Sequence, residues 1–86
     1  MADADFLLEK MRHSKYGWRY NDLVSLYVAF GFEWREGGKH TIFYHPVHGH
    51  LRATVTRSRT LAVGYIQTAL KLIDQLKAVE AVKKGR

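Results

Sequence analysis

One histidine in the sequence stands in a setting suited to chemistry. His40 directly follows two glycines and Lys39, and it opens a run of β-branched and aromatic residues. An imidazole titrates near neutral pH, so it can act as a base or as an acid. The ammonium group of Lys39 can hold an anion and stabilise negative charge, and Gly38 lets a polymer backbone come close. Residues 37–40 are therefore a candidate site for proton transfer on an anionic substrate.

The overall charge favours a polyanionic partner. Fourteen Lys and Arg against eight Asp and Glu give a formal net charge of +6, and a small basic domain most often binds nucleic acid. Arg57 and Arg59 stand just before the expected last helix, where free backbone amides also attract phosphate. We predict that these two arginines and Arg52 bind the polyanion together with Gly38 and Lys39.

RNA is the polyanion whose cleavage these groups suit. It carries its own nucleophile, the ribose 2′-hydroxyl, so cleavage needs a base, an acid for the leaving oxygen and cations for the phosphorane charge. His40 supplies one proton-transfer group, and His45, His48, His50 and Lys39 are open candidates for the other. No metal or other cofactor is predicted, because the chain has no cysteine and three histidines on one turn are a weak ligand pattern.

Periodicity places six elements along the chain. We expect a helix over 4–13 and a second helix from about 20 to Gly31. Three strands follow, over 32–36, 40–45 and 51–57, and a last helix over 64–83. Short turns between consecutive strands make the sheet antiparallel, and the amphipathic helices would cover one of its faces. The expected fold class is therefore α+β, in one domain of residues 1–86. An α-β-β-β-α core over 20–82 follows an extra N-terminal helix.

Alternation predicts which strand residues face the helices. In the third strand Leu51, Ala53 and Val55 point inward, so Arg52 points outward. In the first strand Glu33 and Arg35 share the side opposite to Phe32 and Trp34. The facing of the middle strand is ambiguous because residues 42–44 are all apolar.

The chain shows no membrane signal. No apolar run approaches the roughly 20 residues needed to cross a bilayer. The first twenty residues lack the basic start and long apolar centre of a signal peptide. We therefore expect a cytoplasmic protein without a membrane partner.

Two stretches, FGFEWREGGKHTIFYHP (30–46) and RATVTRSRTLAVGYIQTALKLID (52–74), resemble the HicA toxin family of bacterial toxin–antitoxin systems. The resemblance covers roughly residues 20–76, and the matching residues are Gly31, Phe32, Gly38, Lys39, His40, Phe43, His45 and Pro46. It implies a fold like that of double-stranded RNA-binding domains, cleavage of mRNA with His40 as the catalytic residue, and a HicB-type antitoxin as partner. Lys39 stands where the family has serine, and a second family histidine after the third strand has no counterpart in residues 55–58.

Two other functions fit the same residues. One is a non-catalytic RNA-binding module on the same scaffold, in which Lys39 and the arginines bind RNA without turnover. The other is a protein–protein adaptor whose basic face docks an acidic partner. Salt-sensitive RNA binding that survives His40→Ala would indicate the first of these, and no RNA affinity at physiological salt would indicate the second.

Overall fold

The computed structural model describes residues 3–57 and 61–84. Within them the elements are α1 (Asp3–His13), α2 (Tyr20–Ala29), β1 (Glu33–Gly37), β2 (His40–Tyr44), β3 (Arg52–Thr56) and α3 (Val63–Lys84). The strands form one antiparallel sheet in the order β1-β2-β3. This confirms the α+β class and the expected order of elements. Each described helix is too short or too polar to span a bilayer.

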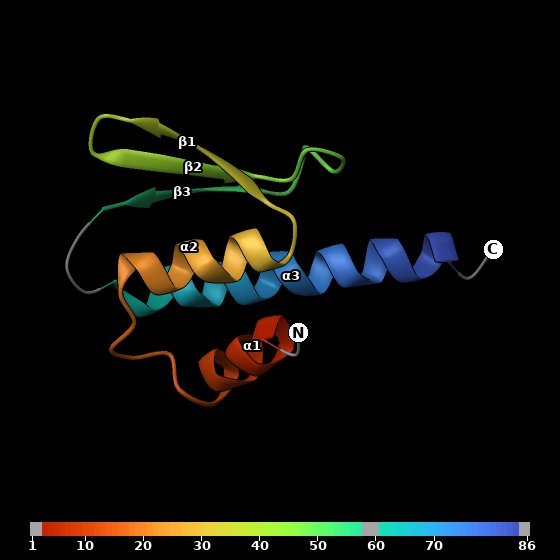
Figure 1. The fold of residues 1–86 in the computed structure, drawn as a ribbon, viewed down its shortest axis with the longest axis horizontal. Coiled ribbons are helices and arrows are strands. Elements are labelled where there is room, and N and C mark those ends of the chain that lie inside the picture. Colours follow the sequence, from red (N-terminus) through yellow and green to blue (C-terminus); the bar gives the residue numbers. More distant parts are fainter. Residues whose placement is uncertain (1–2, 58–60, 85–86) are drawn as a thin grey trace.

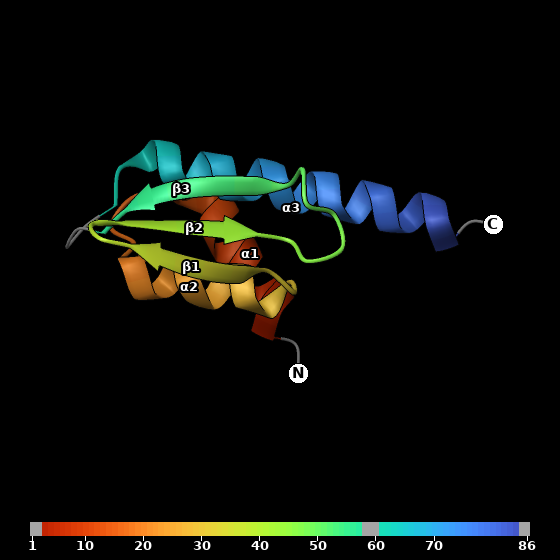
Figure 2. The same ribbon diagram turned by 90° about the horizontal axis from the view of Figure 1, so that it is seen from above.

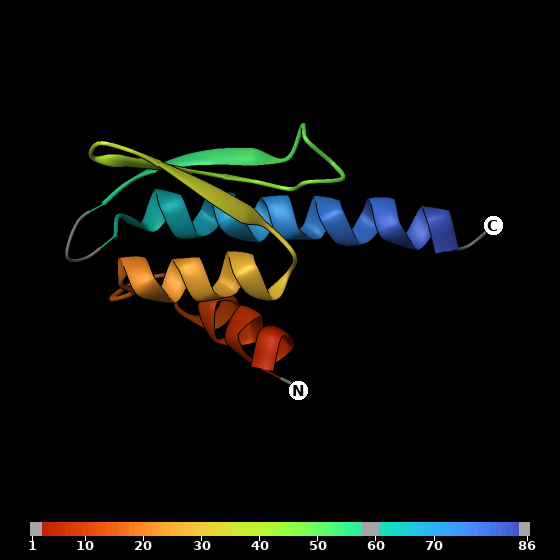
Figure 3. The same cartoon turned by 45° about the horizontal axis from the view of Figure 1, so that its top comes forward.

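The elements stack in three layers (Figure 1). The sheet is the first layer, α2 and α3 lie side by side beneath it, and α1 lies beneath those two helices. Seen from above, β1 runs over α2 and β3 runs over α3 (Figure 2). The opposite face of the sheet carries none of the described elements (Figure 3). The helices therefore cover one face, as expected, and the N-terminal helix packs on the other helices instead of the sheet.

The hydrophobic core lies between the sheet and the helices beneath it. From α3 it receives the stripe that periodicity predicts, with Val79 half-buried and these residues buried: Ile66, Ala69, Leu70, Ile73 and Leu76. From the sheet it receives Phe43, whose ring stacks on that of Tyr27 with centroids 4.4 Å apart and planes 20° apart. Burial of such large apolar rings is the main stabilising contribution in a domain of this size.

α1 contributes buried apolar residues to the core and is joined to α3 by two ion pairs, one of them between Asp5 and Lys77. Leu8 and Met11 are buried, and the Arg12 guanidinium donates hydrogen bonds to both carboxylate oxygens of Asp74. The guanidinium beside it holds the pKa of Asp74 below its usual value. A bidentate pair of this kind fixes the orientation of the helix as well as its position.

The end of α2 sends the chain back over the helices into the sheet. Gly31 has a positive φ of 88°, and its N–H donates to the Val28 carbonyl at 3.0 Å. The N–H of Phe32 reaches back to the Tyr27 carbonyl at 3.0 Å, and the rings of these two residues lie 5.0 Å apart. These are the bonds and the apolar contact of a Schellman motif. They confirm Gly31 as the residue at which the second helix ends.

The side chains of β2 alternate strictly between the two faces of the sheet. Thr41 and Phe43 are buried against the helices, whereas His40 and Ile42 are exposed on the other face and Tyr44 is half-buried there. A threonine is tolerated beneath the sheet because its hydroxyl lies 2.6 Å from the hydroxyl of Tyr20. In β3, Val55 is buried and Arg52 exposed, as the alternation predicts.

Candidate nucleic-acid interface

A two-residue turn carries the candidate histidine. Gly37 pairs with His40 across the β1–β2 hairpin, which leaves Gly38 and Lys39 as the turn. Gly38 has a φ of 65°, a value that residues with a side chain seldom adopt and that a type II′ turn needs at its first position. The glycine before Lys39 is therefore explained by the turn, and His40 begins β2 at a defined register.

Arg57 braces this turn. Its guanidinium donates to the Gly38 carbonyl and lies 3.5 Å from a carboxylate oxygen of Glu36, while its backbone N–H donates to the Lys39 carbonyl at 3.0 Å. Alternation along β1 and β3 puts Glu36 and Arg57 on the helix-facing side of the sheet, whereas His40 belongs to the open side. Arg57 thus fixes the backbone that carries His40 and does not share its face.

The imidazole of His40 is exposed, and it makes no hydrogen bond with any described residue. The N–H of its cross-strand neighbour Thr56 points away from β2, because it donates to the Tyr65 hydroxyl at 3.4 Å. His40 and Thr56 are therefore a non-hydrogen-bonded pair, in which facing residues come closest. On the other side, Gly37 leaves open space beside the ring. The open space at Gly37 and the exposure of the ring leave room for a ribose-phosphate chain beside His40.

Cross-strand pairing arranges the open face in three rows. From the hairpin end to the loop end these are Gly37–His40–Thr56, Arg35–Ile42–Thr54 and Glu33–Tyr44–Arg52. The open face therefore carries one histidine at one end and two arginines, on β1 and β3, farther along it.

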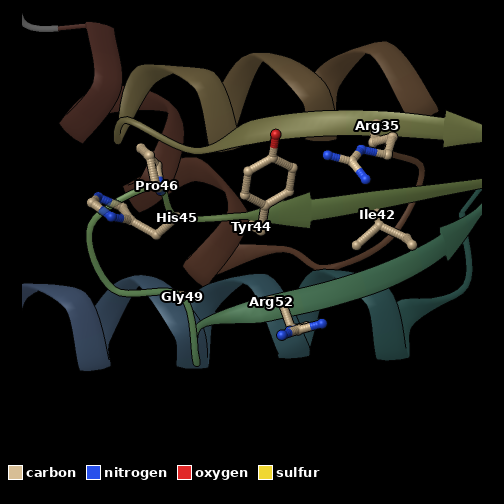
Figure 4. A pocket seen from close by; sticks show the side chains of 7 residues that line it. All are labelled: Arg35, Ile42, Tyr44, His45, Pro46, Gly49 and Arg52. Carbon is tan, nitrogen blue, oxygen red and sulfur yellow. The ribbon is translucent and has the colours of Figure 1, made fainter.

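An open pocket of about 350 Å³ lies over the second and third rows (Figure 4). Its lining is Arg35, Ile42, Tyr44, His45, Pro46, Gly49 and Arg52. Figure 4 shows the Arg35 side chain turned toward the Tyr44 ring, and Arg52 on the strand at the other side of that ring. The pocket therefore places an aromatic surface between two cations.

The predicted site residues separate into two groups. Gly38, Lys39, His40 and Arg57 lie together at the hairpin end. Arg52 lies four residues from the end of β3 that pairs with His40, which is about 13 Å at 3.3 Å per residue. Arg52 therefore lines the pocket and is not part of the site around His40. Arg59 lies outside the described residues.

Arg35 is a site residue to which the sequence assigned no function. Alternation did place it on the outer side of β1, but the sequence does not show which residues of β2 it faces. The register that pairs Arg35 with Ile42 brings it beside the pocket. Only the combination of facing and register could have found it.

His45 has a structural role beside the turn that follows β2. It is buried, and its Nδ1 accepts hydrogen bonds from the backbone N–H groups of Val47 and His48, both at 3.1 Å. Its ring meets the Phe32 ring edge-on with centroids 5.3 Å apart. Burial, with a smaller effect of the nearby His48, lowers the pKa of His45.

The remaining histidines of that turn also lie far from His40. His48 is held near α3, with its Nε2 3.9 Å from a carboxylate oxygen of Glu80. His45 to His50 follow the end of β2, so they lie at the opposite end of the sheet from His40. Among the described residues, no three His, Asp or Glu side chains come together in a group that could hold a metal ion. Of the proposed proton-transfer partners, Lys39 alone stands at the same end as His40.

The His45 turn predicts a pH dependence of stability. Because the folded-state pKa of His45 is lowered, the unfolded chain binds the proton more readily. The free energy of unfolding contributed by this group is present above its ordinary pKa of about 6.5 and is lost as the pH falls. Urea unfolding of wild type at pH 7.5 and 5.5 should show this loss, and His45→Asn, which keeps an acceptor for the turn, should show less of it. Equal losses of unfolding free energy between pH 7.5 and 5.5 in both proteins would contradict this role.

Comparison of the chain with protein-family models, with curated proteins and with solved structures found no significant match. The resemblance to the HicA family therefore stays a prediction from the sequence. The functional conclusions below depend on the residues and the geometry of this chain.

Proposed function

We propose that this protein is a toxin-type endoribonuclease that cleaves RNA without a metal ion. The observation that carries the proposal is the position of His40. Of the described histidines, it alone belongs to a strand, and it lies on the open face of the sheet, where its imidazole is exposed and next in the chain to a lysine. That is the arrangement that proton transfer to and from a ribose-phosphate chain requires.

The chemistry uses the nucleophile that RNA supplies. Neutral His40 takes the proton of a ribose 2′-hydroxyl, and the 2′-oxygen attacks the adjacent phosphorus. The bond from phosphorus to the 5′-oxygen breaks, which leaves a 2′,3′-cyclic phosphate on one product and a 5′-hydroxyl on the other. The ammonium group of Lys39 stabilises the phosphorane charge and gives the proton to the departing oxygen. Proton exchange with water then restores both side chains.

The surroundings of the turn suit an anion. α2 and α3 both begin at the end of the molecule that carries the β1–β2 turn (Figure 1), and helix N-termini attract negative charge. Lys39 is exposed there. The carboxylate of Glu36, next to the turn, already pairs with Arg57. Lys39 therefore supplies an exposed positive charge beside His40.

Substrate and partner follow from the family resemblance. A toxin of this kind acts on mRNA in the cytoplasm and is blocked by a HicB-type antitoxin. The open sheet face is the surface that such an antitoxin would have to cover, because His40 lies there. The order of elements from α2 to α3, α-β-β-β-α, is also that of double-stranded RNA-binding domains, which supports the proposed relation to that scaffold.

The test is cleavage by the purified protein. Single-stranded RNA incubated with the protein in the presence of EDTA should yield shorter fragments on a denaturing gel, with cyclic phosphate at the new 3′ ends. Expression in bacteria should also arrest growth, with mRNA degraded. Intact RNA at every protein concentration, together with normal growth, would overturn the proposal.

A non-catalytic RNA-binding module is the second candidate. It is favoured by the same open face, where one imidazole stands without a second histidine to complete an acid–base pair. In this case RNA binds in a salt-sensitive manner but stays intact, and His40→Ala leaves the affinity unchanged. The gel and a binding titration on the same samples separate the two candidates.

A further inference from the structure

The pocket at the loop end of the open face combines cations with an aromatic surface. Arg35 on β1 and Arg52 on β3 flank Ile42 and Tyr44 of β2. The β2–β3 pairing alternates from the His40–Thr56 pair, so Tyr44 and Arg52 also form a non-hydrogen-bonded pair whose residues lie close together. The bond from the His45 N–H to the Leu51 carbonyl, 3.1 Å long, flanks that pair as expected.

The two pocket arginines differ from Arg12 and Arg57 in their contacts. Arg12 and Arg57 each pair with a carboxylate, whereas Arg35 and Arg52 form no hydrogen bond or ion pair with any described residue. The acidic neighbour in the pocket row, Glu33, accepts a hydrogen bond from the Tyr44 hydroxyl at 3.3 Å. Both guanidinium groups therefore keep their donors for an anion from outside.

We propose that this pocket binds one nucleotide of a single-stranded RNA, apart from the site of cleavage. The base stacks on the Tyr44 ring beside Ile42, and the guanidinium groups of Arg35 and Arg52 bind the phosphates on its two sides. A single strand is required because a base must be unstacked before its face can meet an aromatic side chain. A duplex would offer the arginines its phosphates but leave Tyr44 unused.

The pocket and the histidine lie on one path along β2. His40 and Tyr44 are four residues apart, which is about 13 Å at 3.3 Å per residue. About four stacked nucleotides cover that length at 3.4 Å each, and fewer do when the strand is extended. The pocket therefore acts as a remote subsite for the RNA that His40 is proposed to cleave. This role as a subsite rests on the proposed function.

Binding can be measured without cleavage in a His40→Ala background. The probe is a fluorescein-labelled single-stranded RNA of eight nucleotides, followed by fluorescence anisotropy. Adding Tyr44→Ala should weaken binding between about 5-fold and 150-fold, the range for loss of one stacked base. Tyr44→Phe, which keeps the ring, should stay within about 2-fold. Thermal unfolding of each variant shows whether it is folded, and the arginine variants test the pocket if Tyr44→Ala does not fold.

The contacts of the two arginines with phosphate should appear in the salt dependence of the RNA affinity. Arg35→Gln and Arg52→Gln should each reduce the slope of log affinity against log salt by about 0.7, the value for one phosphate contact to a single strand. Lys71→Gln removes a cation from an exposed position of α3 outside the pocket, so its slope should match that of the parent. Equal losses for Lys71→Gln and the pocket variants would mean non-specific attraction and would overturn the subsite.

The outcomes also separate the subsite from the ribonuclease. If wild type cleaves RNA and the pocket variants bind as the parent does, the subsite is wrong and the proposed function stands. If the pocket variants lose affinity but wild type leaves RNA intact, the subsite stands as an RNA-binding site and the ribonuclease is wrong. Displacement of the RNA by an equal concentration of an octamer of glutamate would overturn the subsite in favour of an acidic protein partner.

Discussion

Replacement of His40 by alanine should lower the rate of RNA cleavage by a factor of about 10²–10⁴, the usual contribution of a general acid or base. The side chain removed is the proton acceptor for the 2′-hydroxyl, and Lys39 does not replace it because an ammonium group has no lone pair. The rate is measured from the loss of intact single-stranded RNA at pH 7 under single-turnover conditions, so that product release does not hide the chemical step.

Two controls make this result specific. His40 is exposed and makes no hydrogen bond with the described residues, so His40→Ala should change the free energy of unfolding by no more than about 0.5 kcal/mol. His50→Ala removes another exposed imidazole, but one at the opposite end of the sheet, and should cleave at the wild-type rate. If His40→Ala and His50→Ala cleave equally fast, His40 is not the catalytic residue.

The sequence predicted the scaffold because its signals are local. Alternation in residues 51–57 and the periodic stripe of the last helix each follow from one segment alone, and the structure confirms both. The middle strand was ambiguous because residues 42–44 are all apolar. Its observed facing buries Thr41, whose hydroxyl finds a partner in Tyr20, a residue of a helix that the strand's own sequence does not reveal.

The sequence predicted only the part of the candidate site whose residues are neighbours in the chain. His40 could be singled out because the glycines, Lys39 and the histidine are neighbours in the chain. The separation of Arg52 from His40, and the use of Arg57 as a brace for the turn, depend on register and on contacts with Glu36 and Gly38. No local sequence pattern predicts these contacts, so the sequence identifies the arginines but does not predict their positions relative to His40.

Replacement of Phe43 by alanine should have the largest effect on stability. Its side chain is fully buried and stacked on Tyr27, and loss of a buried phenylalanine costs about 3–5 kcal/mol of unfolding free energy. Ile42→Ala, one residue away, should cost about 1 kcal/mol or less, because Ile42 is 39% exposed on the open face. Urea unfolding followed by circular dichroism compares the two. Phe43→Leu, which should fall between them, preserves the comparison if Phe43→Ala does not fold.

The ranking of these two variants also tests the site. Residues two apart share a face of the sheet, so His40 is open only if Ile42 is open and Phe43 is inside. A shift of one residue would exchange the faces of the whole strand and put His40 against the helices. A larger loss for Ile42→Ala than for Phe43→Ala would therefore contradict the fold and deprive His40 of its access to RNA. The expected order is consistent with a strand that buries one aromatic ring in the core and keeps an imidazole and the Tyr44 ring on the opposite face.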